Sequence, residues 1–316
     1  MIVTVTLNPA LDKTARLDTL RINALNRLSD VTIDAGGKGI NVSSMIQALG
    51  GDSIAVGFAG GGSGEELLSR ITAKGLRHDF VHIKEPTRTN LKIINASGEL
   101  TEINEAGPEV SAEEFLNLEK KLFQYANEKS LFVLSGSLCR GLGADTYKKL
   151  CAELRKKGSS VFLDVDGEAL KLSLASDRES MPNFLKPNRY ELLALNGIAD
   201  SEDVSDDTLL KLAMPLMEKG LQLCAVSLGS EGALFISKQG VWRSDALKVQ
   251  VMSTVGAGDS MVGSLVYGLE KGLSIEECCA LSVAASAAAC TTQGTKAPSR
   301  DLTDTLLKEV SLRKIT

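Results

Sequence analysis

The residues best suited to chemistry lie at positions 253–260, which read Ser-Thr-Val-Gly-Ala-Gly-Asp-Ser. Glycines at 256 and 258 let successive backbone amides point into one hollow, and a helix beginning here adds partial positive charge. Such a loop can bind phosphate oxygens, and Asp259 beside it could accept a proton from an attacking hydroxyl. The same pattern also suits an acidic residue that only stabilises the first turn of a helix, so the segment alone leaves both roles open.

A second glycine cluster, at residues 36–39, also precedes a predicted helix. Lys38 could bind an anionic group there, and Asn41, one turn further along, could hydrogen-bond a sugar hydroxyl. The cluster is not a P-loop, because Thr32 stands where that motif needs its first glycine and Gly39 where it needs Ser or Thr. An ordinary tight turn between a strand and a helix would explain the same residues.

The sequence lacks the residues that best identify two other enzyme classes. The glycine fingerprint of dinucleotide-binding enzymes fails at Glu65 in one candidate loop and at Met261 in another, which disfavours a nicotinamide-dependent oxidoreductase. The only two histidines, His78 and His82, are spaced like a helical ligand pair, but the residues between them alternate like a strand. We therefore expect neither a zinc site nor a Ser-His-Asp triad.

The composition is that of an ordinary globular protein of 316 residues, 43% hydrophobic and 24% charged. With 35 basic against 40 acidic residues the net charge is −5, so we expect no nucleic acid partner. Residues 278–295 carry no charge, yet they are too weakly hydrophobic for a membrane span. The β-branched N-terminal run predicts a first strand rather than a signal peptide, and no CxxC pair occurs among six cysteines, so we expect reduced thiols and a cytoplasmic location.

Predicted strands and helices alternate along most of the chain, which is typical of a mostly parallel sheet with crossover helices. The predicted strands are 1–7, 53–58, 131–135, 160–164, 184–186 and 223–228. The predicted helices are 40–49, 63–74, 112–126, 145–156, 189–196, 207–219, 257–270 and 275–291. In such a sheet ligands bind beyond the carboxyl ends of the strands, so polar residues at those ends should converge on one cleft.

Two stretches of the chain do not fit this alternation. Residues 15–17 and 28–33, and later 91–95 and 101–104, alternate like half-exposed strands and predict a small accessory sheet made of two separated pieces. A small sheet with one apolar face is unstable alone. It should cover the mouth of the site, a second copy of itself, or both, and we expect a homodimer formed through this lid.

Taken together, these motifs resemble the ribokinase-like sugar kinases of the PfkB family. The resemblance runs from Asn-Pro-Ala-Leu-Asp at 8–12 to Gln-Gly-Thr at 293–295, and GGKGINV at 36–42 and STVGAGDSM at 253–261 carry most of it. It implies an α/β fold: a three-layer α/β/α core with a mostly parallel central sheet, plus a small β-sheet lid. The core would comprise residues 1–8, 35–86 and 108–316, with the lid inserted as residues 9–34 and 87–107.

The resemblance also implies roles for individual residues. Asp259 would be the general base for the acceptor hydroxyl, and the amides of Gly256, Ala257 and Gly258 would form the anion hole for the transferred phosphoryl group. The residues implied to orient the sugar or to hold its existing phosphate are Asp12, Arg27, Gly37, Lys38, Asn41, Arg88, Asn90 and Ser137.

ATP and Mg²⁺ are the cofactors that the resemblance implies, with Glu191 holding the metal through water. The residues implied on the nucleotide side are Lys186, Asn188, Glu191, Ser227, Gly229, Gly232, Thr254, Gly256 and Gly258. Three more, implied to line the adenine slot, are Met261, Val283 and Ala287.

Within the family, residues 8–12, Thr-Arg-Thr-Asn at 87–90 and Ser-Gly-Ser-Leu at 135–138 resemble the branch that phosphorylates sugar phosphates. The implied reaction transfers a phosphoryl group from ATP to fructose 1-phosphate and yields fructose 1,6-bisphosphate. Tagatose 6-phosphate and fructose 6-phosphate are the alternative acceptors, and a non-catalytic sugar-phosphate sensor is the alternative outside enzymes. Cys139-Arg140 replaces prolines common in the family and Val165-Asp166 replaces Ser-Ser, which leaves the preferred ketose phosphate open.

Overall fold

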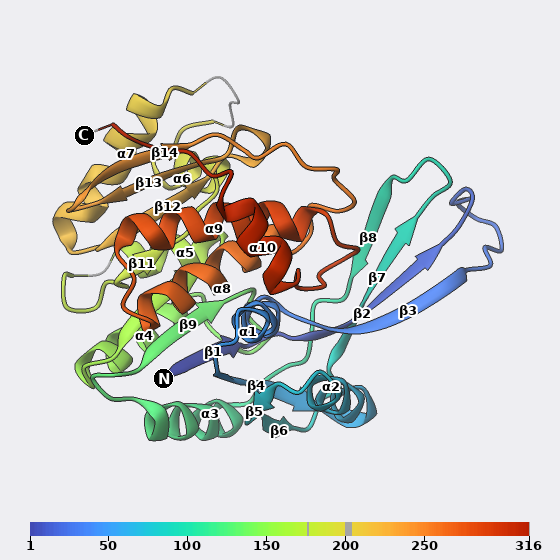
Figure 1. Ribbon diagram of the computed structural model, residues 1–316. Helices are drawn as coiled ribbons and strands as arrows, with labels where there is room; N and C mark the ends of the chain where they lie inside the picture. Colours follow the sequence, from blue (N-terminus) through green and yellow to red (C-terminus); the bar gives the residue numbers. More distant parts are fainter. Residues whose placement is uncertain (176, 200–203, 316) are drawn as a thin grey trace.

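The computed structural model describes residues 1–175, 177–199 and 204–315. Within these residues, helices cover both faces of an eleven-stranded sheet, and a separate four-stranded sheet projects from one side (Figure 1). A search of the same residues for a helix that could cross a bilayer finds none of sufficient length and apolar character.

The central sheet is parallel over most of its width and antiparallel at one edge. Across the sheet the strands are β5 (Arg77–His78), β4 (Ser53–Gly60), β1 (Ile2–Thr6), β9 (Leu131–Ser135), β10 (Ser160–Asp164), β11 (Phe184–Leu185), β12 (Leu223–Ser227), β13 (Ala233–Ser237), β14 (Gly240–Ser244) and β15 (Leu312–Lys314). A short strand, β6 (Val81–Ile83), also pairs with β4. The strand order reverses at β1, the position at which open α/β sheets bind ligands.

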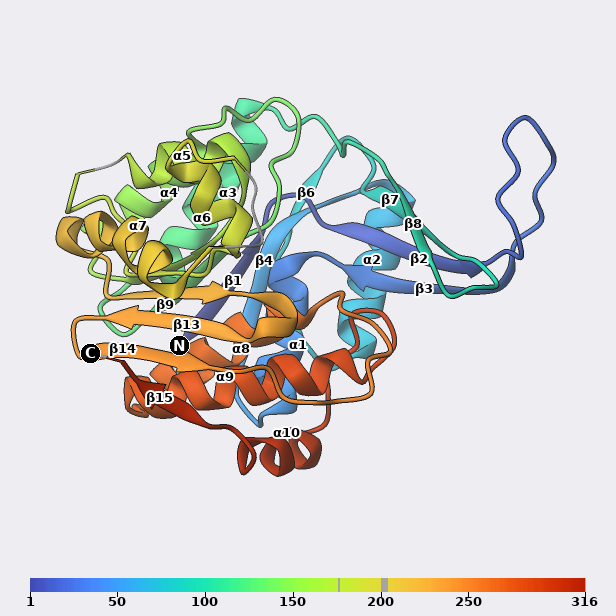
Figure 2. The ribbon, with the colours of Figure 1, turned by 90° about the horizontal axis from the view of Figure 1, so that it is seen from above.

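Alternation along the strands sends side chains into two cores, one on each face of the sheet. Val3 and Val5 of β1 enter one core, and Ile2 enters the other. The first core packs against α3 (Ala112–Tyr125), α4 (Thr146–Lys156), α5 (Gly167–Leu174), α6 (Arg189–Leu195) and α7 (Asp206–Lys219). The second packs against α1 (Lys38–Ala48), α8 (Ala257–Glu270) and α9 (Ile275–Cys290), with α10 (Arg300–Leu307) outside α9 (Figure 2).

The uncharged segment near the C-terminus forms a buried helix. Helix α9 begins with a capping box, in which Ser274 and Glu277 satisfy each other's backbone amides, and its small side chains pack against α8. Close packing recurs between α8 and α1, where a Cβ at Gly263 would lie 2.8 Å from the Cβ of Met45. These contacts fix the start of α8 relative to the sheet.

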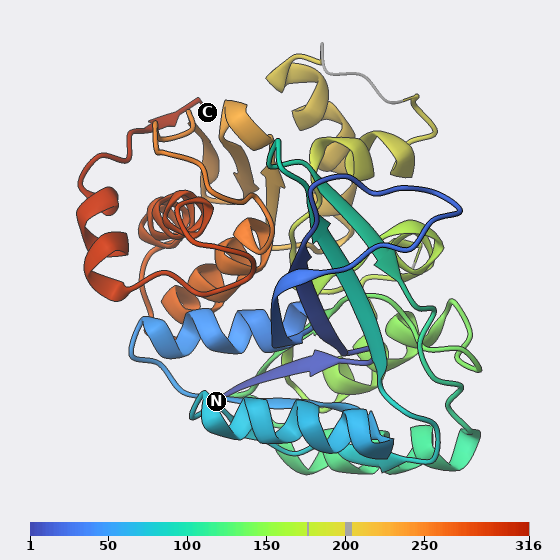
Figure 3. The ribbon, with the colours of Figure 1, turned by 90° about the vertical axis from the view of Figure 1, so that its right-hand side faces the viewer.

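The small sheet confirms the predicted accessory strands. Its order is β3 (Ser29–Gly36), β2 (Ala10–Arg16), β7 (Arg88–Ile94) and β8 (Leu100–Asn104), drawn from the two expected segments. Strand β3 continues two residues past the expected boundary at 34. The base of the sheet joins the core, where Leu11 and Ala35 pack near α2 (Gly61–Ala73). The rest extends away from the core (Figures 1 and 2) and points toward the viewer in Figure 3.

Candidate active site

The carboxyl ends of the parallel strands meet along one edge of the sheet, and their polar residues contact one another. After β1, the Asn8 side chain donates to the Ser137 hydroxyl at 3.2 Å and to the Leu138 carbonyl at 3.1 Å, both just beyond β9. Asp164 ends β10 and Lys186 follows β11. Sequence segments more than 100 residues apart therefore come together here.

Asp259 lies in the first turn of α8 and is 9% exposed. Its Oδ2 accepts a hydrogen bond from the Asn41 side-chain amide of α1 at 2.8 Å. Burial, with added repulsion from Asp164, raises the pKa of the Asp259 carboxyl to about 6, against the opposing hydrogen bond from Asn41. A carboxylate with this pKa is suited to accept a proton near neutral pH.

Two lysines converge on Asp164, which is 1% exposed. The ammonium nitrogens of Lys186 and Lys38 lie 3.3 and 3.4 Å from the same carboxylate oxygen. Burial opposes the charged form of Asp164, but the two cations outweigh it and lower the pKa of the carboxyl. The other oxygen, Oδ2, is buried and accepts no hydrogen bond within the described part of the chain. Two lysines and one aspartate give the cluster a net positive charge beside the glycine loop, which suits an anionic ligand.

The glycine loop leaves an open surface beside Lys186. Gly256 has a left-handed conformation with φ of 84°, which turns the chain into α8. A Cβ at Gly258 would lie 3.5 Å from the Lys186 ammonium nitrogen, so bare backbone faces this cation. The first amides of α8 and the Lys186 charge can therefore act on one ligand oxygen.

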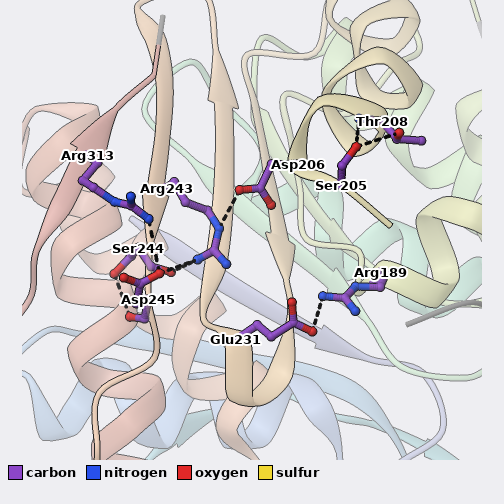
Figure 4. Close-up of polar contacts among 9 residues, drawn as sticks. All are labelled: Arg189, Ser205, Asp206, Thr208, Glu231, Arg243, Ser244, Asp245 and Arg313. Atoms are coloured by element: carbon purple, nitrogen blue, oxygen red, sulfur yellow. Dashed lines mark hydrogen bonds and ion pairs between the residues drawn. The ribbon is translucent and has the colours of Figure 1, made fainter. Parts of the chain in front are cut away.

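The predicted nucleotide side is built from α6 and the turn after β12. Asn188 caps α6 and forms a capping box with Glu191, and it also pairs with Ser227 in an isolated bridge. Arg189 contacts Glu231 of the short 3₁₀ helix η1 (Gly229–Glu231) at 2.5 Å, which ties this turn to α6 (Figure 4). Burial raises the pKa of the Glu191 carboxyl.

The predicted sugar side lies on the small sheet. Asp12 of β2 accepts from the Asn90 side chain at 3.0 Å and from the Lys92 ammonium at 2.8 Å, both on the adjacent strand β7. Arg88, at the start of β7, donates to the backbone carbonyls of Asn8 at 3.1 Å and Glu105 at 2.9 Å. These residues belong to the small sheet, and Arg88 joins it to the core through the carbonyl of Asn8.

A cavity of about 1230 Å³ separates the small sheet from the core. Thr14, Lys92 and Leu100 line it on one side, and Val251, Thr254 and Thr295 line it on the other. It reaches Lys92 beside Asp12 and Val255 at the start of the glycine loop. Asp12 and Asp259 are 7% and 9% exposed, and neither forms part of the cavity wall.

Four predicted site residues lie outside these contacts. Arg27 is exposed in the loop 17–28, which follows Arg16 at the end of β2. Arg16 lies four residues beyond Asp12, about 13 Å along the strand at roughly 3.3 Å per residue. Met261 and Val283 are buried in the core on the α8–α9 side, and Ala287 is half-buried. The adenine slot therefore stays a prediction.

Sequence reasoning did not assign roles to Asp164 and Lys92. Asp164 is the one charged residue of an otherwise apolar or small strand, which is a signal that could have found it. Lys92 carries no such signal, because its partner Asp12 lies 80 residues away and is brought to it by strand pairing.

Comparison with known proteins agrees with this geometry. The model of the pfkB family carbohydrate kinases matches residues 6–302. The chain belongs to the PfkB family. It is 37% identical over 289 residues, 91% of each protein, to a 1-phosphofructokinase of Borreliella burgdorferi. It is 34% identical over the full length of each protein to a 1-phosphofructokinase of Bacillus subtilis.

The solved structures agree as well. The Escherichia coli phosphofructokinase-2 in complex with potassium superposes with a TM-score of 0.91 at 33% identity, over 98% of each chain. The expected ribokinase-like α/β/α fold with its small sheet is thereby confirmed. As a PfkB carbohydrate kinase, the protein is an ATP-dependent phosphotransferase.

Proposed function

We propose that this PfkB kinase transfers the γ-phosphoryl group of ATP to fructose 1-phosphate and forms fructose 1,6-bisphosphate. The observation that carries the transfer is Asp259, a buried acid of raised pKa beside the open backbone of the glycine loop. The choice of acceptor is supported by relatives at 34–37% identity that are named 1-phosphofructokinase.

In the proposed reaction Asp259 accepts the proton of the sugar's free primary hydroxyl as that oxygen attacks the γ-phosphorus. Asn41 holds one oxygen of the carboxylate and so aims the other. The amides of Gly256, Ala257 and Gly258 stabilise charge on the transferred group, and Lys186 adds a positive charge beside them. The bond to ADP breaks as the new O–P bond forms, and the hydroxyl proton ends on Asp259.

The residues present fit ATP with Mg²⁺. Mg²⁺ generally uses one or two carboxylates together with water and substrate phosphates, and when bound it neutralises the triphosphate. Glu191 lies beside Asn188. The Oδ2 of Asp164, which accepts no hydrogen bond from the residues that the structure describes, adds a second buried acceptor beside two lysines. We infer that Glu191 holds a metal-bound water and that Lys186 and the 229–232 turn hold nucleotide phosphates.

The sugar is proposed to bind between the two sheets. Asp12, Asn41, Gly37 and Ser137 orient its hydroxyls, and cationic residues hold the existing phosphate. The latter are Lys38 and Arg88, while a role for Arg27, in the exposed loop beyond β2, stays a prediction. Lys38 already forms an ion pair with Asp164. Arg88 is half-buried, and a hydrogen bond from its charged group to a phosphate is stronger there than in water.

The alternative acceptors differ in where their existing phosphate lies. We expect the wild-type enzyme to phosphorylate fructose 1-phosphate with a kcat/KM at least tenfold above that for tagatose 6-phosphate or fructose 6-phosphate, in one ATP-consumption assay. Asp259→Asn should lose 10²- to 10⁴-fold in kcat while ATP binding survives, since it removes a general base. Preference for a 6-phosphate would replace the proposed substrate, and a near wild-type kcat in Asp259→Asn would end the base role.

We also propose that the kinase is a homodimer formed through the small sheet. Strand register puts Val31 and Ile103 on the face turned away from the cavity, where they are 45% and 54% exposed. Ile22 and Leu25 of the adjoining loop are 79% and 66% exposed. A second copy of this surface is the partner whose chemistry matches it.

A further inference from the structure

Lys92 forms a buried ion pair with Asp12 on the small sheet, and it has no role in the function proposed above. The ammonium of Lys92 lies 2.8 Å from Oδ2 of Asp12, and the two side chains are 11% and 9% exposed. Removing one member of such a pair leaves a buried charge without its counter-charge, which is far more costly than losing a surface pair. The arrangement therefore constrains Asp12 strongly.

The Asp12 carboxylate is fixed on every side that the sheet presents. Asn90 donates to Oδ1 at 3.0 Å while Lys92 donates to Oδ2. Across the neighbouring strand, a Cβ at Gly36 would lie 2.5 Å from Asp12 Cγ, so the carboxylate packs against bare backbone. Two donors and one close packing contact leave it a single orientation.

Lys92 also balances a local excess of negative charge. Asp34 and Glu102 share the face of Asp12 in the strand register, and Glu102 lies 3.9 Å from the Lys92 ammonium. A sugar phosphate approaching this face brings further negative charge. Arg16 lies on the same face, but its side chain is 58% exposed and pairs with Asp30.

We propose that Lys92 is a positioning residue that holds Asp12 in the orientation in which it binds the sugar hydroxyls. This inference rests on the proposed function, because it takes Asp12 to be a sugar ligand. Lys92 then sets the affinity for the sugar phosphate and leaves the phosphoryl transfer at Asp259 and the nucleotide side unchanged.

The test compares Lys92→Met, Lys92→Gln and Lys92→Arg by steady-state kinetics and by calorimetric binding of fructose 1-phosphate without ATP. Lys92→Met should raise both the KM and the Kd for the sugar phosphate at least tenfold, with kcat and the KM for ATP within threefold of wild type. Lys92→Arg should recover most of the affinity. The matched control is Arg16→Met, which removes a cation from the same face without touching Asp12 and should stay within twofold.

A double-mutant cycle separates positioning from direct contact with the ligand. If Lys92 acts through Asp12, adding Lys92→Met to Asp12→Asn should cause less than a twofold further loss of sugar affinity. Losses that multiply in the double variant, or an unchanged Kd in Lys92→Met, would overturn the inference. Should Lys92→Met fail to fold, Lys92→Gln against Lys92→Arg gives the same comparison.

The outcome remains separate from that of the proposed substrate. If the wild-type enzyme prefers tagatose 6-phosphate or fructose 6-phosphate, the proposed acceptor fails and the same series is measured with the preferred sugar. A KM for ATP that rises as much as the KM for the sugar would show general damage to the site and would also reject the positioning role.

Discussion

Among single residues, Asp259 is the proposed general base, and its surroundings suit it to that role. A carboxylate in water would be too weak a base, but burial and the nearby Asp164 raise its pKa to about 6. The same burial keeps water from competing for the proton. Asn41 prevents the pKa from rising further, so that the carboxylate is largely ionised at neutral pH.

The raised pKa predicts the pH dependence of the reaction. A general base acts in its deprotonated form, so kcat/KM should rise as the pH passes upward through about 6 and level off above 7. The second ionisation of a phosphate ester falls near the same pH, about 6. The residual activity of Asp259→Asn serves as the control, because it retains the substrate's ionisation and lacks the base. Identical profiles for the two enzymes would contradict the assignment.

Sequence patterns predict Asp259 and Asn41 because each follows a glycine cluster at the start of a helix. They do not predict the Lys38–Asp164–Lys186 cluster, because its geometry depends on three strand ends far apart in sequence. The sequence pattern also could not show that repulsion from Asp164 contributes to the raised pKa of Asp259.

At the scale of elements, the junction between the glycine loop and α8 combines one constrained glycine with one unconstrained glycine. Gly256 needs its left-handed conformation, whereas Gly258 is helical and faces Lys186 across ordinary contact distance. The backbone at Gly258 therefore does not require a glycine, and we propose that this residue matters because the space beside it stays open.

We predict that Gly258→Ala keeps its fold and loses activity. The added methyl would lie 3.5 Å from the Lys186 ammonium, where a transferred phosphoryl group is proposed to sit, and a shift of about 1 Å can cost on the order of 10² in kcat. The control is Gly62→Ala on α2, where, among the described residues, the new methyl meets no atom within 4 Å beyond its chain neighbours and its own helix backbone. Thermal unfolding checks that the fold is kept, and kcat measures the loss of activity. A kcat within twofold of wild type would contradict the prediction.

The elements themselves differ in how far the sequence predicts them. Strands 131–135 and 160–164 and helix 257–270 match the structure residue for residue, since burial makes their patterns strong. The sequence does not predict the hairpin of β13 and β14, because Lys238-Gln239 is not one of the glycine or asparagine turns that mark a hairpin. Strand β15 has three residues and forms only through pairing with β14.

At the scale of the whole molecule, the exposed apolar face of the small sheet that carries Val31 and Ile103 predicts a homodimer. Light scattering at micromolar concentration should give twice the 33.5 kDa mass of the chain. Ile103→Lys combined with Val31→Lys should shift the mass to that of one chain, because two buried charges would face each other across the interface. Met214→Lys, a change at a 42% exposed residue of α7, should leave the dimer intact. A single-chain mass for the wild type would contradict the proposal.

The central position of β1 has a consequence for biosynthesis. This strand, Ile-Val-Thr-Val-Thr, is fully buried between β4 and β9, yet the first residue of β9 comes 129 residues after the first residue of β1. At about 5–20 residues per second, the ribosome reaches β9, the second neighbour of β1, roughly 6 to 26 s after it has synthesised β1. During that interval an apolar, β-prone segment has one edge unpaired, which is where nascent chains aggregate. The yield of active enzyme should therefore depend on chaperone capacity and on translation speed across the codons for residues 1–135.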